Sequence, residues 1–384
     1  MKVLWIGPFF SEKAIREKKA PNLAAMKWSL GLLRGLVAVG CKVRVIDHCT
    51  EQRWPAGKVF WQNGNPKWFQ DWLPCECVSY FNVVGIKDWW LSQAYARAVR
   101  RVVDEWHPDV LLAYNSLHSF NVAAMKVAST MGIPCVPIIL DGDDPRQDDW
   151  RKLLYDNRFA SGVVFLSWWM FKNYPNQNIP LFHMDGGADG FKGDFAIDWR
   201  LSQTVNNGRY TLAHTGALDY WRGLDFMKSV VRTCRRDDVR FIFCGKCDVE
   251  QMRAEFNYDY RVEVKGFLSN AEVDSLCRSA DVFLNVRTPG LGDNLVNYPS
   301  KIPNYLSWGK PVVSTWNDSF SPDYRELLEV SDDTPEGFVR VLDDVLSWGV
   351  EKRKEKYAQI RSWFEEHKSW SRQASRLVTW LRSF

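Results

Sequence analysis

The sequence lacks the hydrophobic segments that would carry a chain into or across a membrane. No uninterrupted run of about 18 apolar residues occurs among its 384 residues, so nothing is expected to span a bilayer. The apolar run at the start of the chain ends at Gly7 and Pro8 after four residues, too few for a signal peptide. We therefore expect a cytoplasmic protein, and keep open a peripheral position on the cytoplasmic face of the membrane.

A strong charge of one sign is also absent. The net charge is +4 at pH 7, which is small for this length and does not indicate a nucleic-acid groove. Basic residues do gather among apolar ones between positions 13 and 34. This segment is either a solvated helix face or a contact with an anionic membrane or a phosphate-bearing acceptor.

Cysteines are few, odd in number and scattered, and do not suggest a disulfide framework. The nine thiols fit a reduced chain in which most of them are buried. Cys244 and Cys247 have the spacing of one half of a zinc site, but no second pair follows. Tryptophan, in contrast, is abundant. Many of the 20 tryptophans lie between 54 and 90, where they fill a core, stack on sugar rings or face a membrane.

The pattern of short apolar runs predicts an α/β fold. The run 2–7 is followed by an amphipathic segment, 22–39, that ends at Gly40, and then by a second apolar run at 42–47. A strand, a helix, a glycine and a strand describe a parallel unit with a right-handed crossover. The alternation returns up to residue 167 and begins again after a glycine-rich stretch. The later strands are expected at 209–216, 239–245, 261–266, 281–286 and 311–315.

We therefore predict two doubly wound, Rossmann-like domains that face each other across a cleft. The first covers residues 1–190, a linker covers 191–208, and the second covers 209–368. Residues 369–384 predict an amphipathic helix that packs back on the first domain. In open parallel sheets a ligand binds beyond the carboxyl ends of the strands, so the site should lie in the cleft.

Two cations stand at loop-to-helix junctions of the second domain. Ser300 and Lys301 follow Pro299, where a helix start would offer N–H groups, a hydroxyl and an ammonium to a phosphate. Arg222 opens an earlier helix, so the two cations suit a diphosphate. In the alternative interpretation, Ser300 only caps the helix and Lys301 is solvated. Neither junction contains the phosphate loop of nucleotide hydrolases, and no dinucleotide-binding glycine motif follows either first strand.

The second domain resembles the nucleotide-sugar glycosyltransferases of the GT-B fold, especially glycosyltransferase family 4. The resemblance rests on Gly216 followed by Arg222-Gly223, and on the turn, helix and strand of 266–286. It also rests on the segment PSKIPNYLSWGKPVV at 299–313 and on the interdomain segment 185–195. These motifs follow one another in the order typical of the family.

The resemblance implies a donor site. The residues so implied are Gly216, Arg222, Gly245, Phe267, Leu268, Ser300, Lys301 and Asn304. Arg222 and Lys301 would hold the diphosphate, the backbone at Phe267 and Leu268 would receive the nucleotide base, and Asn304 would bind a ribose or sugar hydroxyl. The glycines would let the chain approach the donor. No cofactor or metal is expected, because the cations neutralise the leaving diphosphate.

The chain departs from the family where retaining members carry paired glutamates. Val296 and Asn304 stand at those positions, so inversion at the anomeric carbon is favoured. An inverting transfer needs a base opposite the diphosphate, and the acids that end the strand at 134–141 are candidates. Asp141 is the first choice and Asp144 is the reserve. The alternative is that these acids only cap a helix.

We therefore expect a glycosyltransferase that moves a sugar from a nucleotide-diphosphate donor to a glycan, a lipid-linked sugar or another hydroxyl acceptor. Assembly of a cell-surface polysaccharide or glycoconjugate is the expected setting. The expected partners are the donor, the acceptor and, peripherally, an anionic membrane, but no nucleic acid. Two alternatives stay open: a catalytically inactive donor-binding or scaffold subunit, and a sugar-nucleotide epimerase of the same fold.

Overall fold

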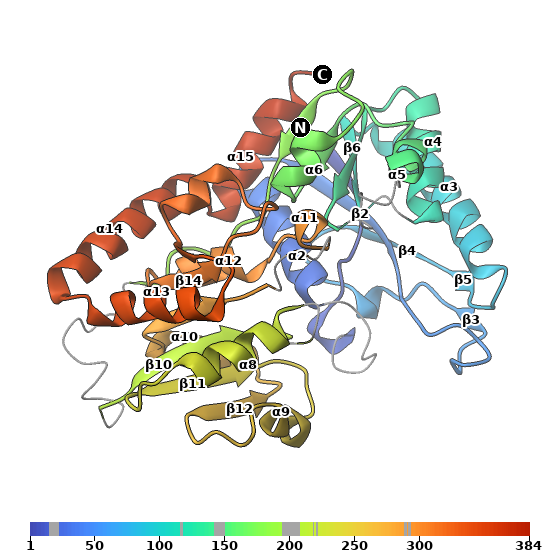
Figure 1. The fold of residues 1–384 in the computed structure, drawn as a ribbon. Helices are drawn as coiled ribbons and strands as arrows, with labels where there is room; N and C mark the ends of the chain where they lie inside the picture. Colours follow the sequence, from blue (N-terminus) through green and yellow to red (C-terminus); the bar gives the residue numbers. More distant parts are fainter. Residues whose placement is uncertain are drawn as a thin grey trace. The chain divides into compact units, whose positions relative to one another are not determined.

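The chain divides into two compact units, each built on its own sheet (Figure 1). The computed structural model describes residues 1–14, 23–115, 118–141, 150–193, 208–217, 219, 222–287, 290 and 293–384. Unit 1 consists of residues 1–187 and 370–384, and unit 2 of residues 188–369. The predicted α/β fold with two doubly wound parts is confirmed.

The boundary between the units lies close to the start of the expected linker. The N–H of Ala188 donates to Lys368 O at 3.0 Å, and that of Lys192 donates to Ser307 O at 2.6 Å. These bonds attach residues 188–193 to unit 2. Most of the expected linker, residues 194–207, lies outside the described residues.

Unit 1 contains a seven-stranded parallel sheet with the order β4-β2-β1-β6-β7-β8-β9. Its strands are β1 (Lys2–Ile6), β2 (Lys42–His48), β4 (Cys75–Val78), β6 (Val110–Tyr114), β7 (Cys135–Ile139), β8 (Val163–Phe165) and β9 (Leu181–His183). Its helices are α2 (Leu23–Ala38), α3 (Lys87–Trp106), α4 (Ser119–Thr130), α5 (Trp150–Asp156), α6 (Trp168–Asn173) and α15 (Trp370–Leu381). A separate antiparallel pair is formed by β3 (Trp61–Gln62) and β5 (Tyr80–Phe81).

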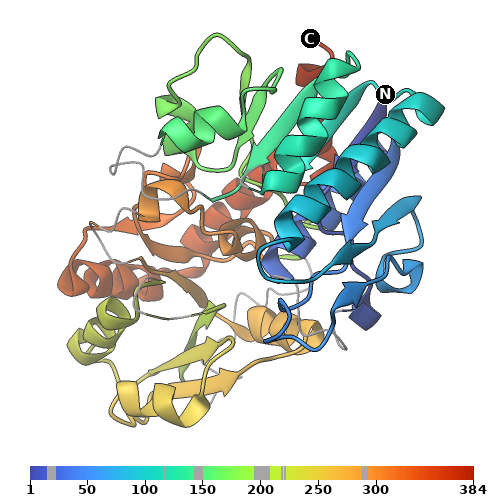
Figure 2. The ribbon, with the colours of Figure 1, turned by 90° about the vertical axis from the view of Figure 1, so that its right-hand side faces the viewer.

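The inner strands of unit 1 form because their apolar runs are buried on both faces. Every side chain of β6 and β7 is buried, as expected inside a doubly wound sheet. Helices α3 and α4 lie side by side over the sheet (Figure 2) and share a core with β1 and β6. Strand β1 leads into Gly7, where a Cβ would lie 2.5 Å from the Cβ of Tyr114, so only glycine fits.

The C-terminal helix α15 packs against α2 through two glycines. A Cβ at Gly31 would lie 2.1 Å from the indole of Trp370, and one at Gly35 would lie 2.4 Å from the Trp370 backbone O. The Trp370 ring also meets Trp28 edge-on, with 5.7 Å between ring centroids. Because the two glycines lack side chains, the backbones of the two helices come into contact.

Unit 2 contains a six-stranded parallel sheet with the order β12-β11-β10-β13-β14-β15. Its strands are β10 (Tyr210–Thr215), β11 (Val239–Cys244), β12 (Val262–Gly266), β13 (Val282–Asn285), β14 (Val312–Thr315) and β15 (Glu329–Ser331). Its helices are α8 (Leu224–Thr233), α9 (Val249–Glu255), α10 (Asn270–Ser279), α11 (Asp293–Val296), α12 (Lys301–Leu306), α13 (Pro335–Ser347) and α14 (Val350–His367).

The strand order of unit 2 reverses between β10 and β13. From β10 the chain proceeds outward to β11 and β12, and it then continues on the other side of β10 with β13, β14 and β15. The carboxyl ends of β10 and β13 are therefore the topological switch point, where open parallel sheets bind their ligands. Any ligand site of unit 2 is expected first at this place.

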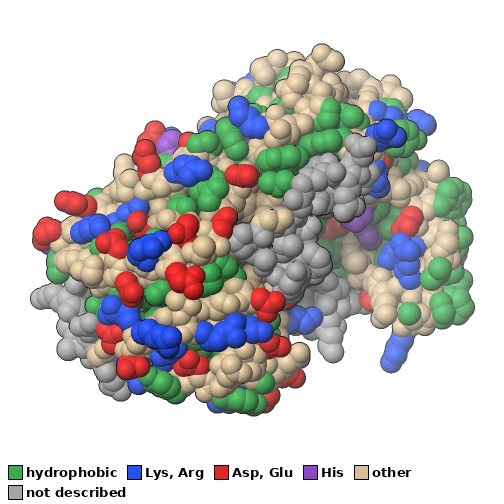
Figure 3. Space-filling view, in the orientation of Figure 1, with side chains coloured by type: hydrophobic (Ala, Val, Ile, Leu, Met, Phe, Trp, Pro, Cys, Tyr) green, Lys and Arg blue, Asp and Glu red, His purple; other side chains and the backbone are tan. Residues whose placement is uncertain are grey.

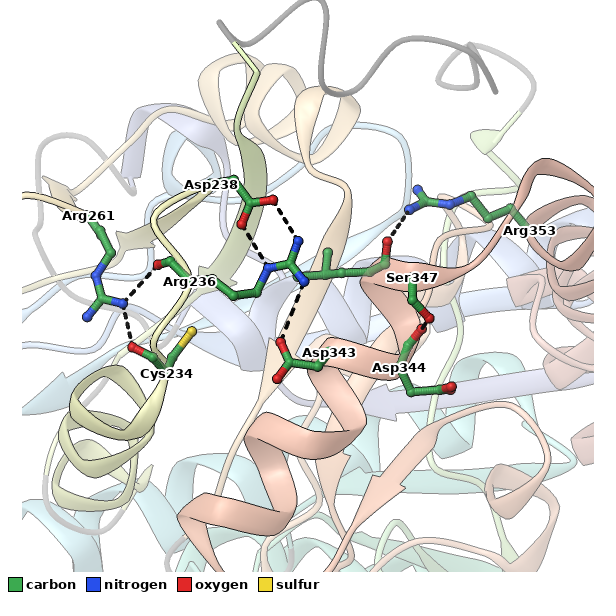
Figure 4. Close-up of polar contacts among 9 residues, drawn as sticks. Cys234, Arg236, Asp238, Arg261, Asp343, Asp344, Ser347 and Arg353 are labelled. Atoms are coloured by element: carbon green, nitrogen blue, oxygen red, sulfur yellow. Dashed lines mark hydrogen bonds and ion pairs between the residues drawn. The ribbon is translucent and has the colours of Figure 1, made fainter.

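An arginine network occupies the opposite, amino edge of the unit 2 sheet (Figure 4). Arg236 binds both carboxylate oxygens of Asp238, at 2.8 and 2.6 Å, and lies 3.7 Å from Asp343 of α13. Arg261 donates to the backbone O atoms of Cys234 and Arg236, which follow α8. These contacts attach α8 and α13 to the starts of β11 and β12.

Exposed apolar side chains gather on unit 1 around β3 and β5 (Figure 3). We call this group the aromatic surface; it consists of Trp54, Phe60, Trp61, Val84, Ile86 and Trp89. Phe81 joins its rings, because Phe60 and Trp61 contact Phe81 at 5.5 and 4.5 Å between centroids. Part of the tryptophan-rich segment is therefore surface and not core. None of the helices within the described ranges has both the length and the apolar character needed to cross a bilayer.

Gly35→Ala is expected to destabilise unit 1 by about 1–3 kcal/mol, because the new methyl would strike the Trp370 backbone. Alanine otherwise favours a helix interior by about 1 kcal/mol over glycine, so a net loss isolates the clash. Gly349→Ala is the control, because nothing lies within 4 Å of that position and its φ of −70° is ordinary. Urea unfolding monitored by circular dichroism measures both variants, and equal stability of the two would contradict the contact.

Candidate functional site

The carboxyl ends of β10 and β11 meet through two glycines. Gly216 has a φ of 101°, which strains any side chain, and a Cβ at Gly245 would lie 2.2 Å from Gly216 O. The N–H of Gly216 donates to Cys244 O, and that of Gly245 donates to Gly266 O, both at 2.8 Å. Gly245 is therefore required for the contact between the two loops. Its predicted contact with a donor stays a prediction.

A third glycine brings Arg222 beside the end of β13. Gly223, directly before α8, has a φ of 91°, and a Cβ there would lie 3.0 Å from Val286 Cγ2 and 3.3 Å from Arg287 N. The half-exposed Arg222 forms an ion pair with Asp219. Neighbouring loops thereby carry two guanidinium groups, those of Arg222 and Arg287, to the switch point.

Helix α12 is anchored to the end of β10 by Tyr305. The Tyr305 hydroxyl accepts the backbone N–H of Thr215 at 2.7 Å, and its ring stacks on Phe283 with 4.4 Å between centroids. Lys301 lies one helical turn earlier on the same face. The Nζ of Lys301 lies 3.0 Å from Nε2 and 3.5 Å from Nδ1 of His214, a fully buried residue of β10.

Positive charge is concentrated around Lys301. Burial, followed by the charges of Arg287 and Arg222, lowers the pKa of the Lys301 ammonium well below its ordinary value. Burial and then the charge of Lys301 likewise lower the pKa of His214, so that its imidazole is neutral at pH 7. A bound anion would relieve the repulsion among the three cations. The arrangement is therefore suited to a phosphate or a diphosphate.

The other residues predicted for the donor site also lie at the carboxyl edge of the sheet. Ser300 is exposed and makes no capping hydrogen bond, because its own φ and ψ are already helical. The alternative in which Ser300 caps α12 and Lys301 is solvated is therefore wrong. Asn304 is half-buried on α12, one turn after Lys301. Phe267 and Leu268 follow β12, two strands from β10, and the Phe267 ring is 68% exposed.

The predicted catalytic acids are not among the residues of unit 2. Asp141 is exposed and follows β7 in unit 1. Burial, and then the negative charge of Asp141, raises the pKa of the Tyr114 hydroxyl at the end of β6. Asp144 lies outside the described residues.

The two cysteines with zinc-like spacing are free thiols. Burial raises the pKa of Cys244 to about 11 and also raises the pKa of Cys247. A raised thiol pKa disfavours the thiolate that binds a metal ion. Within the described ranges, no group of three or more His, Cys, Asp or Glu side chains is arranged for a metal.

Three residues around Lys301 were not predicted from the sequence to belong to the site. His214 lies inside an apolar run and was interpreted only as part of a strand. Arg287 directly follows the predicted strand 281–286, and this position after a parallel strand could have identified it. Tyr305 follows the predicted helix start, but its bond to β10 spans 90 residues of sequence.

Residues 209–347 match the model of the family described as Glycosyl transferases group 1. The matched segment contains Arg222, Arg287 and Lys301. The predicted resemblance to these glycosyltransferases is confirmed by the match, which lies within unit 2. No curated protein matches the chain.

Several solved structures are similar in fold over the whole length of the chain. HepE from Anabaena in complex with UDP superposes with a TM-score of 0.67 at 14% identity, over 100% of both chains. Sucrose-phosphate synthase from Thermosynechococcus elongatus gives 0.63 at 11% identity, over 100% of this chain and 98% of that one. A UDP-forming α,α-trehalose-phosphate synthase from Burkholderia xenovorans, in complex with glucose-6-phosphate, gives 0.65 at 10% identity over 100% of both chains. At these identities the likeness shows the fold, and the predicted GT-B-like class is confirmed.

Proposed function

We propose that the chain is a glycosyltransferase that moves a sugar from a nucleotide-diphosphate donor to a hydroxyl acceptor on a glycan or a lipid-linked sugar. The observation that carries the proposal is the cluster of Lys301, Arg222 and Arg287 at the switch point of a group 1 glycosyltransferase domain. Such a cluster is suited to the one part that all nucleotide-sugar donors share, which is the diphosphate.

The cluster would act on the leaving group of the reaction. In the transfer, the bond between the anomeric carbon and the diphosphate oxygen breaks, and the electron pair stays on the diphosphate. The acceptor oxygen forms the new bond to carbon, and its proton passes to a base. Fixed cations that face the developing negative charge stabilise the transition state. Burial and the two arginines lower the pKa of Lys301, and a bound anion would favour its charged form.

UDP is the proposed nucleotide. HepE, which shares the fold, has been solved in complex with UDP and with UDP-glucose, and the trehalose-phosphate synthase neighbour is UDP-forming. The base would stack or bond at the exposed edge formed by Phe267 and Leu268, which follow β12. Formation of a cell-surface polysaccharide or glycoconjugate is the proposed setting of the reaction.

Lys301→Ala, Arg222→Ala and Arg287→Ala are each expected to weaken UDP binding by about 10- to 100-fold. Each variant removes one charge-assisted contact to phosphate, which contributes roughly 1.5–3 kcal/mol. Isothermal titration calorimetry measures the affinity, and thermal unfolding checks that each variant is folded. Arg232→Ala is the control, because it removes the same charge from an exposed residue in the last turn of α8. An equal loss of UDP affinity in Arg232→Ala would show that only the net charge matters, and would contradict the proposed diphosphate site.

We further propose inversion at the anomeric carbon, with Asp141 as the base. Supporting this, Val296 and Asn304 stand where retaining relatives carry glutamates, and Asp141 is an exposed carboxylate at the carboxyl end of β7. A base activates the acceptor hydroxyl from the face of the sugar opposite the diphosphate. Asp144 is the reserve candidate for the same role.

Asp141→Asn is expected to lower turnover by about 10²- to 10⁴-fold while UDP affinity stays nearly unchanged. Turnover is measured with radiolabelled UDP-glucose and a panel of acceptors, and NMR of the product reports the anomeric configuration. Retention of the donor configuration would rule out the inverting mechanism whatever the variant does. Donor binding without turnover would favour the inactive scaffold, and a changed sugar without acceptor would favour the epimerase.

A lipid-linked acceptor would place the protein at a membrane, and the aromatic surface supports this part of the proposal. Tryptophan side chains favour the boundary between lipid and water. Lys27 and Arg34 are exposed on α2, whereas Arg16, Lys18 and Lys19 of the basic segment lie outside the described residues.

The full chain is expected to sediment with vesicles of anionic phospholipid and to be released by salt. Trp54→Ala and Trp89→Ala should each reduce the bound fraction, because each removes an exposed indole from the aromatic surface. Tyr155→Ala is the control, since Tyr155 is an aromatic residue outside that surface and is at least as exposed as the two tryptophans. Absence from the vesicles at low salt would favour a soluble acceptor.

A further inference from the structure

His214 is a buried ionisable side chain for which the donor site alone gives no role. It lies in β10, is fully buried, and its Nδ1 lies 3.1 Å from Leu284 O of β13. A carbonyl oxygen only accepts, so Nδ1 carries the hydrogen and donates it. This bond crosses the switch point and fixes the orientation of the imidazole ring.

The ammonium of Lys301 lies over the face of this ring. Its Nζ is nearly equidistant from the two ring nitrogens of His214, at 3.0 Å from Nε2 and 3.5 Å from Nδ1. A position in the ring plane, along the lone pair of Nε2, would place Nζ much farther from Nδ1. The contact therefore joins a cation to the electron-rich face of an imidazole, as cations contact other aromatic rings.

Burial, and then the positive charges around His214, disfavour a protonated ring. The groups that act on it are Lys301 of α12, Arg287 after β13, and the backbone of Leu284 and Ala217. Those that act on Lys301 are Arg287, Arg222 and the thiol of Cys244 at the end of β11. Among the described residues, neither set contains a carboxylate. A protonated imidazole would add a fourth positive charge beside three cations.

We propose that His214 is a positioning residue, whose neutral imidazole face holds the Lys301 ammonium at the carboxyl ends of β10 and β13, where the donor diphosphate binds. The inference rests on the proposed function, because it assigns to Lys301 a contact with the diphosphate. An aliphatic residue at position 214 would leave the ammonium half-buried without this support. A carboxylate there would pair with the ammonium and compete with the donor for it.

The test compares two substitutions of His214 in the full chain, with UDP as the probe. His214→Leu is expected to weaken UDP binding by about tenfold, because the aliphatic side chain offers no aromatic face. His214→Phe should keep the affinity within about threefold of the wild type, because a phenyl ring still offers such a face. Calorimetry measures the affinities, and thermal unfolding shows that both variants fold. Equal losses in the two variants would overturn the proposal.

A second pair of variants separates positioning from a general structural effect. In the Lys301→Ala background, His214→Leu should cause no further loss of UDP affinity, since the supported ammonium is already absent. A loss that persists in this background would show that His214 acts on the fold and not through Lys301, and would overturn the proposal.

NMR of the chain labelled with ¹⁵N-histidine tests the protonation state directly. The chain contains six histidines, and His214→Phe identifies the signal of His214 by its loss. A neutral ring with its hydrogen on Nδ1 is expected at pH 7, and an imidazolium would overturn the proposal. Lys301→Ala should raise the pKa of His214, because it removes a neighbouring positive charge.

The experiments distinguish this inference from the proposed function. If UDP does not bind the wild type, the donor site itself is wrong. If UDP binds and Lys301→Ala weakens it, but His214→Leu does not, the donor site stands and only the role of His214 is refuted.

Discussion

Unit 2 is organised around an ammonium group that its surroundings disfavour. Lys301 is half-buried, and the nearest charged groups that act on it are two guanidinium groups. Burial and like charge both lower the stability of the charged form, and no carboxylate in the described part of the chain is among the groups that offset them. A fold keeps such an arrangement only if the backbone around it is held firmly. A bound anion would convert the same repulsion into binding energy.

The backbone around Lys301 is held by contacts that fix the loops at the carboxyl edge of the unit 2 sheet. Gly245 and Gly223 let the loops after β11 and before α8 touch their neighbours, because a Cβ would collide at Gly245 and would be tightly packed and strained by the positive φ at Gly223. Tyr305 binds the last N–H of β10 and stacks on Phe283 of β13, so α12 is attached to the two strands of the switch point. At the amino edge, Arg236 and Arg261 attach α8 and α13 to the sheet. The cluster therefore does not depend on α12 alone, which is only six residues long.

The inner strands were predictable because burial on both faces produces continuous apolar runs, and helix α2 was predictable from its amphipathic pattern and the glycine that ends it. Helix α3 was not predicted. Five strands were not predicted. Strands β4, β9 and β15 lie at sheet edges, where half-buried residues leave no such run. Strands β3 and β5 form the separate antiparallel pair and are only two residues long each. Arg222 and Lys301 could be assigned to one site because the carboxyl ends of parallel strands meet at the same edge. His214 could not, because its contacts to Leu284 and Lys301 join positions 70 and 87 residues apart. The periodicity of apolar residues along the sequence predicts which residues are buried, but it does not predict which polar group a buried histidine contacts.

A neutral ring beside Lys301 leaves its ammonium free to bind a diphosphate, whereas a carboxylate at the same position would compete with the diphosphate. A buried carboxylate at position 214 would satisfy the ammonium of Lys301 in the free protein, and a diphosphate would then have to displace it or share it. A neutral imidazole supports the ammonium through a weaker interaction and cancels none of its charge. The full charge of Lys301 thus remains available to a ligand, at the cost of a lowered pKa in the free protein. Burial is the main reason that His214 stays neutral, and the cations that it helps to hold add to the effect, because protonating the ring becomes harder as positive charge gathers around it.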